Sequence, residues 1–167
     1  YIKIFQNLGL SPIPVRANTG DIGGNYSHEI HLAADRGEST IFYDNRIVEM
    51  MSGSDWQIEQ LNNFYAAEEE KHDISSVDSI TAKYLVQSKG IEVGHLFYLN
   101  TKYSKVMNLQ VNDSNGARLY PYMGCYGIGI SRLVGAIIEV NHDDHGIIWP
   151  EQISPFKYII INLQVNN

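Results

Sequence analysis

The sequence has a single cysteine, few basic residues and no long apolar run, and each of these shortages excludes a class of protein. One cysteine excludes an intramolecular disulfide framework and a cysteine-rich zinc site, so a reducing cytoplasm is the simplest location. No apolar stretch approaches the length of a membrane span. Residues 1–6 lack the basic start and long apolar core of a signal peptide. We therefore expect a cytoplasmic protein without a membrane partner.

The charge balance is acidic, with 12 Lys and Arg against 19 Asp and Glu and a formal net charge of −7. Binding of nucleic-acid phosphates depends largely on Lys and Arg. The sequence shows no dense cluster of basic residues. These residues are therefore not expected to form a nucleic-acid platform by themselves.

The length of 167 residues suits one hydrophobic core, and the apolar fraction of 44% is ordinary for a globular domain. The spacing of apolar residues and the positions of Gly and Pro predict a short set of elements. We expect helices over 1–8, 55–71, 79–89 and 131–139, strands over 13–17, 29–33, 41–43, 92–99 and 157–163, and a hairpin turn at 112–116. This order predicts an α+β fold, a mainly antiparallel sheet flanked by helices.

The most informative segment is residues 123–139, MGCYGIGISRLVGAIIE. Glycines at near-alternate positions remove side-chain bulk where a strand is expected to turn into a helix. Arg132 follows in the first helical turn, where a guanidinium can stack on a ring or meet a phosphate. The segment therefore predicts a nucleotide site.

Three blocks of the chain, in order, resemble bacterial-type prolyl-tRNA synthetases, which are class II aminoacyl-tRNA synthetases. Residues 124–134, with EVNHDDHGIIWP at 139–150 and SPF at 154–156, resemble motif 3 of that family. NTGDIGGNYSHEIH at 18–31 resembles the strand that follows motif 2. GIEVGHLF at 90–97, with TKYS at 101–104, resembles the prolyl-pocket strand. The resemblance covers most of the chain apart from about 41–89.

The resemblance implies an aminoacyl-tRNA ligase that activates L-proline with ATP and Mg²⁺ to prolyl-adenylate and transfers the prolyl group to tRNA(Pro), as a homodimer. Motifs 1 and 2 have no counterpart in this sequence. We therefore expect residues 1–156 to be the later part of a catalytic core, inactive alone. Residues 41–89 are expected to be a short insert in place of an editing domain. Residues 157–167 are expected to begin an anticodon-binding domain.

The same resemblance suggests roles for individual residues. Arg132 is the expected catalytic residue, because the α-phosphate gathers negative charge as the carboxylate attacks it. Arg132, Gly129 and Glu92 are expected to bind ATP. Glu92 would do so through the magnesium ion of ATP, and its alternative role is to pair with a nearby cation. His95, Gly124, Cys125 and Gly127 are expected to line the proline pocket, and His28 or Glu29 to form part of the site wall.

Simpler roles stay open for several of these residues. Cys125 also suits a small buried hydrophobe. Strand alternation puts Val93 and Phe97 on the face of His95 and Glu92 on the other, unless a bulge intervenes. Residues 27–29, Ser-His-Glu, cannot form a relay among themselves, because neighbours on a strand point to opposite faces. Residues 142–145, His-Asp-Asp-His, are expected to shape a turn, and no structural metal is expected.

Two other functions are compatible with parts of the pattern. A synthetase-like paralogue that binds nucleotide or amino acid without charging tRNA would share these blocks and lack an intact motif 2. A freestanding editing domain would need the large insertion, and the span 41–89 is too short to hold it.

Overall fold

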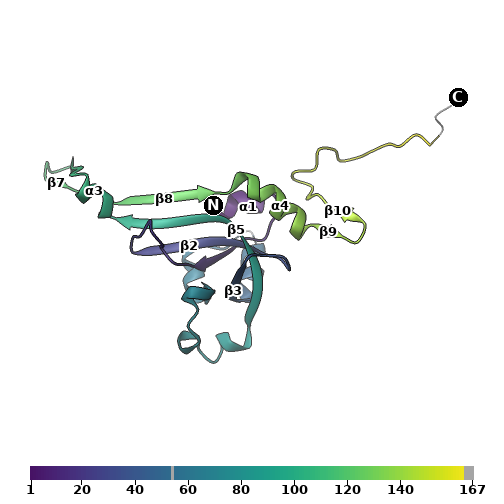
Figure 1. Ribbon diagram of the computed structural model, residues 1–167, viewed down its shortest axis with the longest axis horizontal. Coiled ribbons are helices and arrows are strands. Elements are labelled where there is room, and N and C mark those ends of the chain that lie inside the picture. The colour runs from purple at the N-terminus through teal and green to yellow at the C-terminus, as the bar shows by residue number, and fades with distance from the viewer. Residues whose placement is uncertain (54, 164–167) are drawn as a thin grey trace.

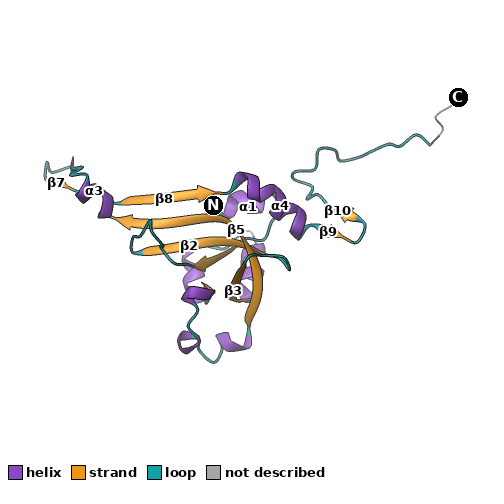
Figure 2. Ribbon diagram, in the orientation of Figure 1, coloured by secondary structure: helices purple, strands orange, loops and turns teal. Residues whose placement is uncertain are grey.

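The computed structural model describes residues 1–53 and 55–163, which form a six-stranded sheet, two separate two-stranded hairpins and several short helices (Figures 1 and 2). None of the described helices has the length and apolar character needed to cross a bilayer. The helices are α1 (Ile2–Asn7), α2 (Arg46–Ser52), α3 (Lys102–Val106) and α4 (Ile130–Val140), with 3₁₀ turns η1 (Ile58–Asn63), η2 (Glu69–Lys71), η3 (Ile74–Ser76) and η4 (Thr81–Lys83). The strands are β1 (Ile13–Arg16), β2 (Tyr26–Ala33), β3 (Ser39–Asp44), β4 (Ala66–Glu68), β5 (Leu85–Asn100), β6 (Val111–Asn112), β7 (Arg118–Leu119), β8 (Met123–Ile128), β9 (His142–Asp143) and β10 (Gly146–Ile147).

The long strand β5 organises the sheet. Its first part pairs with β3, its second part pairs with β2, and β8 pairs with the second part along the opposite edge from β2. Because β2 also pairs with β1, β1 with β4, and β4 with β3, these strands close into a ring. All these pairings are antiparallel except that of β1 with β4. The predicted fold class is confirmed, with the parallel pair as a minor deviation.

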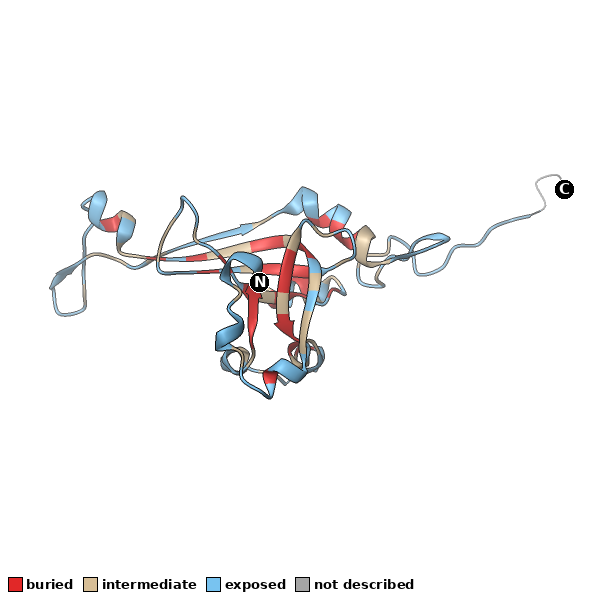
Figure 3. Ribbon diagram, turned by 60° about the horizontal axis from the view of Figure 1, so that its bottom comes forward, coloured by how far each residue is buried: buried red, intermediate tan, exposed pale blue. Residues whose placement is uncertain are grey.

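Two apolar clusters hold the sheet in place. Figure 3 shows that buried residues are concentrated in the strands of the sheet. In the larger cluster, Ile2 and Phe5 of α1 lie against Ile30 and Val93. The other helix of this cluster, α4, contributes Leu133, Ala136 and Ile137. The smaller cluster joins β1, β3 and β4 to α2 through Ile13, Val15, Ile41, Tyr43, Ile47 and Ala66. The motif 3-like helix is therefore fixed to the sheet by its apolar side.

Several predicted elements are confirmed, and two helices are wrong. Helix α1, strands β1, β2 and β3, the hairpin turn at 112–116 and helix α4 lie where expected. The predicted helix 55–71 is instead η1, β4 and η2. The predicted helix 79–89 is η4 followed by the start of β5. In both places the neighbouring strands override local helical spacing, because β4 and the first part of β5 supply the backbone partners of β3.

The strand predicted at 157–163 is not formed. These residues carry no regular structure and leave Tyr158, Ile160 and Leu163 exposed. A strand needs a neighbour that satisfies its backbone groups, and no described strand lies beside this segment. Residues 164–167, which also belong to the expected anticodon-binding domain, lie outside the described residues.

Gly90, where β5 passes from β2 to β3, has no room for a side chain. A Cβ there would lie 2.8 Å from Nδ1 of the buried His31 and 3.2 Å from Cδ1 of Ile41. We expect Gly90→Ala to lower the free energy of unfolding by about 1–3 kcal/mol, measured by urea denaturation. Gly135→Ala is the matched control, because nothing lies within 4 Å of its Cβ position and alanine favours a helix. Equal stability of the two variants would contradict the packing argument.

Candidate functional site

One face of the β2–β5–β8 sheet carries most of the expected site residues, and we call it the His95 face. The register pairs Glu29 with His95, His95 with Gly127, and Phe97 with Cys125. Directly paired residues on neighbouring strands point to the same side of a sheet. The His95 face therefore comprises Ser27, Glu29, His31, Glu92, His95, Phe97, Cys125 and Gly127.

A β-bulge at Val93 brings Glu92 to this face. Ile30 pairs with Gly94 and His31 with Glu92, so Val93 is an extra residue in β5. Val93 is buried in the apolar cluster below the sheet, and the Glu92 carboxylate lies 3.3 Å from Nδ1 of His95. The prediction from simple alternation, which put Val93 on the face of His95 and Glu92 on the other face, is therefore wrong for both residues. Bulges redirect side chains in this way.

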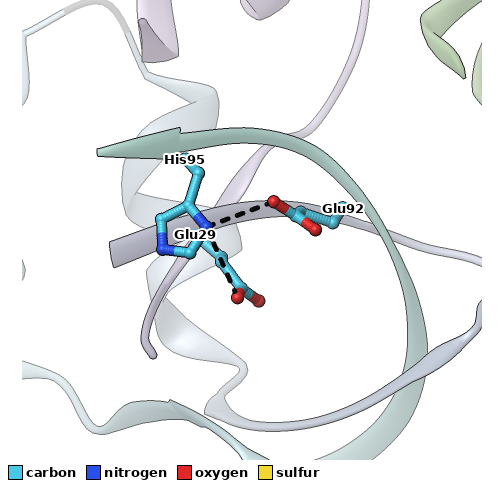
Figure 4. A group of neighbouring side chains, drawn as sticks. All are labelled: Glu29, Glu92 and His95. Atoms are coloured by element: carbon cyan, nitrogen blue, oxygen red, sulfur yellow. Dashed lines mark ion pairs between the residues drawn. The ribbon is translucent and has the colours of Figure 1, made fainter. Parts of the chain in front are cut away.

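The His95 ring contacts three polar side chains on this face, those of Ser27, Glu29 and Glu92. Its Nε2 is hydrogen-bonded to Oγ of Ser27, and its ring stacks on Phe97 with the centroids 3.9 Å apart. The second ring nitrogen, Nδ1, lies 3.3 Å from Glu92 and 3.7 Å from Glu29 (Figure 4). Ser27, His28 and Glu29 do not form a hydrogen-bonded relay with one another, as expected from their alternation on the strand. Instead, Ser27 and Glu29 both contact His95 from the neighbouring strand.

Glu29 is held in place by a second histidine, which lies two residues further along β2. His31 is fully buried, and its Nε2 lies 2.7 Å from Oε2 of Glu29. Nδ1 of His31 has no hydrogen-bond partner. A buried N–H without an acceptor is costly, so we assign the proton to Nε2, which donates it to Glu29. The Glu29 carboxylate is thus fixed with its other oxygen directed at His95.

Arg132 lies at the start of α4, next to Glu92. The N–H of Gly129, which caps this helix, donates to the carbonyl of Val93 over 3.1 Å and so ties the helix start to the bulge. The Arg132 Nη1 donates to the carbonyl of Glu92 at 3.1 Å and lies 3.4 Å from its carboxylate. It also lies 3.2 Å from the Glu38 carboxylate. Since 51% of the Arg132 side chain is exposed, the guanidinium can reach a ligand.

The glycine-rich strand β8 divides its residues between the two faces. Cys125 is exposed on the His95 face, so it is not the small buried hydrophobe of the simpler alternative. At Gly127, on the same face, nothing lies within 4 Å of the Cβ position. Gly124 pairs with Tyr98 on the opposite face, where its Cβ would meet the ring of Tyr126. The structure therefore separates Gly124 from the pocket residues with which it was grouped.

His28 also lies on the opposite face, where it pairs with Arg16 and Leu96. Desolvation of its ring is the main cause that lowers the pKa of His28, followed by the electrostatic effects of Arg16 and of His95. Of the two residues expected at the site wall, only Glu29 faces His95. The His28 ring favours its neutral form on the far side of the sheet.

Residues 142–145 form the first strand and the turn of the small hairpin of β9 and β10. The Asp143 carboxylate accepts hydrogen bonds from the backbone N–H groups of His145 and Gly146. His142 Nδ1 contacts the carbonyl of Glu139 at 2.8 Å. These contacts agree with the expected turn, because the side chains of His142 and Asp143 contact local backbone groups.

Comparison with known proteins identifies the family. The profile of the tRNA synthetase class II core domain (G, H, P, S and T) matches residues 1–141. The chain belongs to this family. The matched segment includes every residue of the His95 face, as well as Gly129 and Arg132.

Individual relatives in this family are similar over nearly the whole chain. A proline–tRNA ligase of Ehrlichia canis is 54% identical over 167 residues. Proteins with the same name from Wolbachia pipientis wMel and Rickettsia canadensis are 52% identical over 164 residues and 48% identical over 167 residues. These alignments cover 98–100% of this chain but only 38–39% of each relative.

Three contacts of this class II core were not expected from the sequence. Ser27 is bonded to His95, His31 orients Glu29, and Glu38 shares the guanidinium of Arg132. One signal for the first two was present. Ser27, Glu29 and His31 are polar at every second position of a strand, which predicts a polar face. Glu38 follows a turn, and no spacing in the sequence connects it with Arg132.

Proposed function

We propose that the chain is part of the catalytic core of a ligase that activates L-proline with ATP and transfers it to tRNA(Pro). The observation that carries this proposal is the 48–54% identity, across essentially the whole chain, to proteins named proline–tRNA ligase. The class II core match supports the same reaction class. The site geometry supplies a compatible arrangement of charge and open space.

The nucleotide end of the proposed site is Arg132 with Glu92 and Gly129. An exposed guanidinium fixed at a helix start can neutralise charge that builds up on the α-phosphate as the amino-acid carboxylate attacks in line. Glu92 lies beside it with 32% of its side chain exposed. A carboxylate in this position suits the Mg²⁺ that accompanies ATP. Rate acceleration then comes from positioning and charge, without a protein nucleophile.

The proline end of the proposed site is His95 with Cys125 and Gly127. The open space at Gly127 and the exposed Cys125 lie on the same face as the His95 ring. We infer that the compact pyrrolidine ring of proline occupies this space, where a small change in volume alters binding. Gly124, which points to the other face, is left out of this wall.

Further proposals concern the whole protein. We infer a homodimer in the cytoplasm that also binds tRNA(Pro). Residues 157–167 begin an anticodon-binding domain, and residues 41–89 take the place of an editing insertion. In the described structure that span supplies β4 and most of β3 to the ring.

The test is an aminoacylation assay of the full-length protein with ATP, Mg²⁺, labelled proline and tRNA(Pro). We expect proline-dependent ATP–pyrophosphate exchange and acid-stable charging of tRNA(Pro), with alanine and cysteine as competing amino acids. Exchange without charging, or binding without exchange, would overturn the ligase proposal in favour of a synthetase-like binding protein.

The proline end has its own test in His95→Ala. Removing the ring is expected to raise the KM for proline about tenfold and to reduce discrimination against alanine, because one wall of the pocket is lost. The assay is ATP–pyrophosphate exchange over a range of proline and alanine concentrations. His28→Ala, a histidine on the opposite face of the same sheet, is the control and should leave both values unchanged. Equal effects of the two substitutions would contradict the placement.

A further inference from the structure

The three acidic and imidazole side chains in Figure 4 have the spacing of a metal site. Glu29, Glu92 and His95 each offer one ligand atom, and these atoms lie within 4.8 Å of one another. The His95 Nδ1 is 3.3 Å from Oε1 of Glu92 and 3.7 Å from Oε1 of Glu29. Two ligands at 2.0–2.2 Å from a tetrahedral ion are about 3.4 Å apart. Both distances are close to that value.

The other polar atom of each side chain is already engaged. Oε2 of Glu29 accepts from the buried His31, Oε2 of Glu92 faces Arg132, and Nε2 of His95 is bonded to Ser27. Metal ligands typically have such outer partners, which fix the orientation of the coordinating atom. Here the outer partners leave Oε1 of Glu29, Oε1 of Glu92 and Nδ1 of His95 directed at one another.

The hydrogen-bond pattern suits a cation as well. Two carboxylates approach Nδ1 of His95, and its Nε2 is bonded to Ser27. With the proton on Nε2, directed at Ser27, Nδ1 presents a lone pair to the space between the two carboxylates. Three acceptors then converge on one point, which a divalent cation would satisfy.

We propose that Glu29, Glu92 and His95 bind a first-row divalent cation of the Zn²⁺ or Mn²⁺ type. One imidazole with two carboxylates fits these ions better than Mg²⁺, which prefers oxygen ligands and water. The exposures of the side chains are 15%, 32% and 19%, which leaves an entry path and room for a fourth ligand from solvent or substrate. The ion binds without ATP, which separates this site from nucleotide-bound magnesium. It does not depend on which amino acid the protein activates.

The test is titration of the chelator-treated, nucleotide-free protein with Zn²⁺ alone, and then with Mn²⁺ and Mg²⁺, by isothermal titration calorimetry. We expect one Zn²⁺ per chain, weaker binding of Mn²⁺, and little binding of Mg²⁺. Glu92→Gln and His95→Gln should each weaken Zn²⁺ at least tenfold. Glu29→Gln should do the same, and circular dichroism of each variant establishes that the fold is retained.

Matched controls address other ligands. Glu38→Gln removes a carboxylate that contacts Arg132 outside the trio, Cys125→Ser removes the thiol on the same face, and His142→Ala with His145→Ala removes the hairpin imidazoles. All three should bind Zn²⁺ as the unchanged protein does. X-ray absorption should give nitrogen and oxygen ligands at about 2.0–2.2 Å and no sulfur at about 2.3 Å.

Four outcomes would overturn the proposal: absence of Zn²⁺ binding, binding that survives Glu92→Gln and His95→Gln, sulfur in the coordination shell, and binding that requires ATP. The ligase proposal would stand in each of these cases, because its own test measures charging of tRNA. Conversely, a protein that binds Zn²⁺ through this trio but does not charge tRNA would retain the metal site and lose the proposed function.

Discussion

Arg132→Ala in the full-length protein is expected to slow proline-dependent ATP–pyrophosphate exchange by roughly 10²–10³-fold. Removing a fixed positive group that acts on developing charge typically costs about 3–4 kcal/mol of transition-state stabilisation. Arg132 is the guanidinium fixed at the start of α4, with bonds to Glu92 and an ion pair to Glu38. The measurement is kcat/KM for exchange in the two proteins.

Stability provides the internal control for this variant. The ion pairs of Arg132 are half exposed, and exposed pairs contribute at most about 1 kcal/mol. Thermal denaturation should therefore change little. Lys157→Ala removes another exposed cation, which pairs with Glu151 at 2.9 Å and is not part of the His95 face. Exchange that is unchanged in the Arg132 variant, or lowered equally in both, would place Arg132 among ordinary surface arginines.

Gly127→Val is expected to raise the KM for proline by about 10–100-fold and to leave the KM for ATP nearly unchanged. The added side chain enters open space on the His95 face, because nothing lies within 4 Å of the Cβ position. It therefore occupies volume that the proline ring needs without clashing with the protein. One methylene of misfit in an apolar pocket costs about 1–3 kcal/mol. The measurement is exchange kinetics with each substrate varied in turn.

Gly135→Val is the control for this substitution. Gly135 also has free space at its Cβ position, but it lies on the exposed side of α4. It should leave both KM values unchanged. A rise in the KM for ATP alone in the Gly127 variant would mean that the proline and nucleotide ends of the site are exchanged.

The spacing of apolar residues predicted those elements whose apolar side packs on the core, such as helix α4. Helix α4 begins one residue from its expected start, because the glycine-rich strand and the apolar spacing both mark it. The predicted helices at 55–71 and 79–89 failed for the opposite reason. Their residues supply hydrogen-bond partners to β3, a strand distant in sequence, and helical spacing carries no information about that pairing.

At the site, too, the sequence did not show how neighbouring strands pair. The resemblance pointed to Glu92, His95 and Arg132 as individual residues, and the structure places them next to one another. Simple alternation separated Glu92 from His95, because a single extra residue at Val93 cannot be located from spacing. The register between β2 and β5 places Ser27 and Glu29 on the same face as His95 and places His28 on the opposite face. A bulge and a register depend on two strands at once, so one strand alone does not reveal them.

Closure of the strands into a ring limits where insertions and deletions can occur in this chain. Between residues 41 and 89, β4 covers the free edges of β1 and β3, and β3 covers the first part of β5. Deleting β3 and β4 would expose the backbone N–H and C=O groups of these strands, and bare edges favour association between copies. Residues 69–84 contribute no strand to the ring in the described structure. Insertions and deletions are therefore best accommodated between β4 and β5, where they lengthen a connection without opening the hydrogen-bonded circuit.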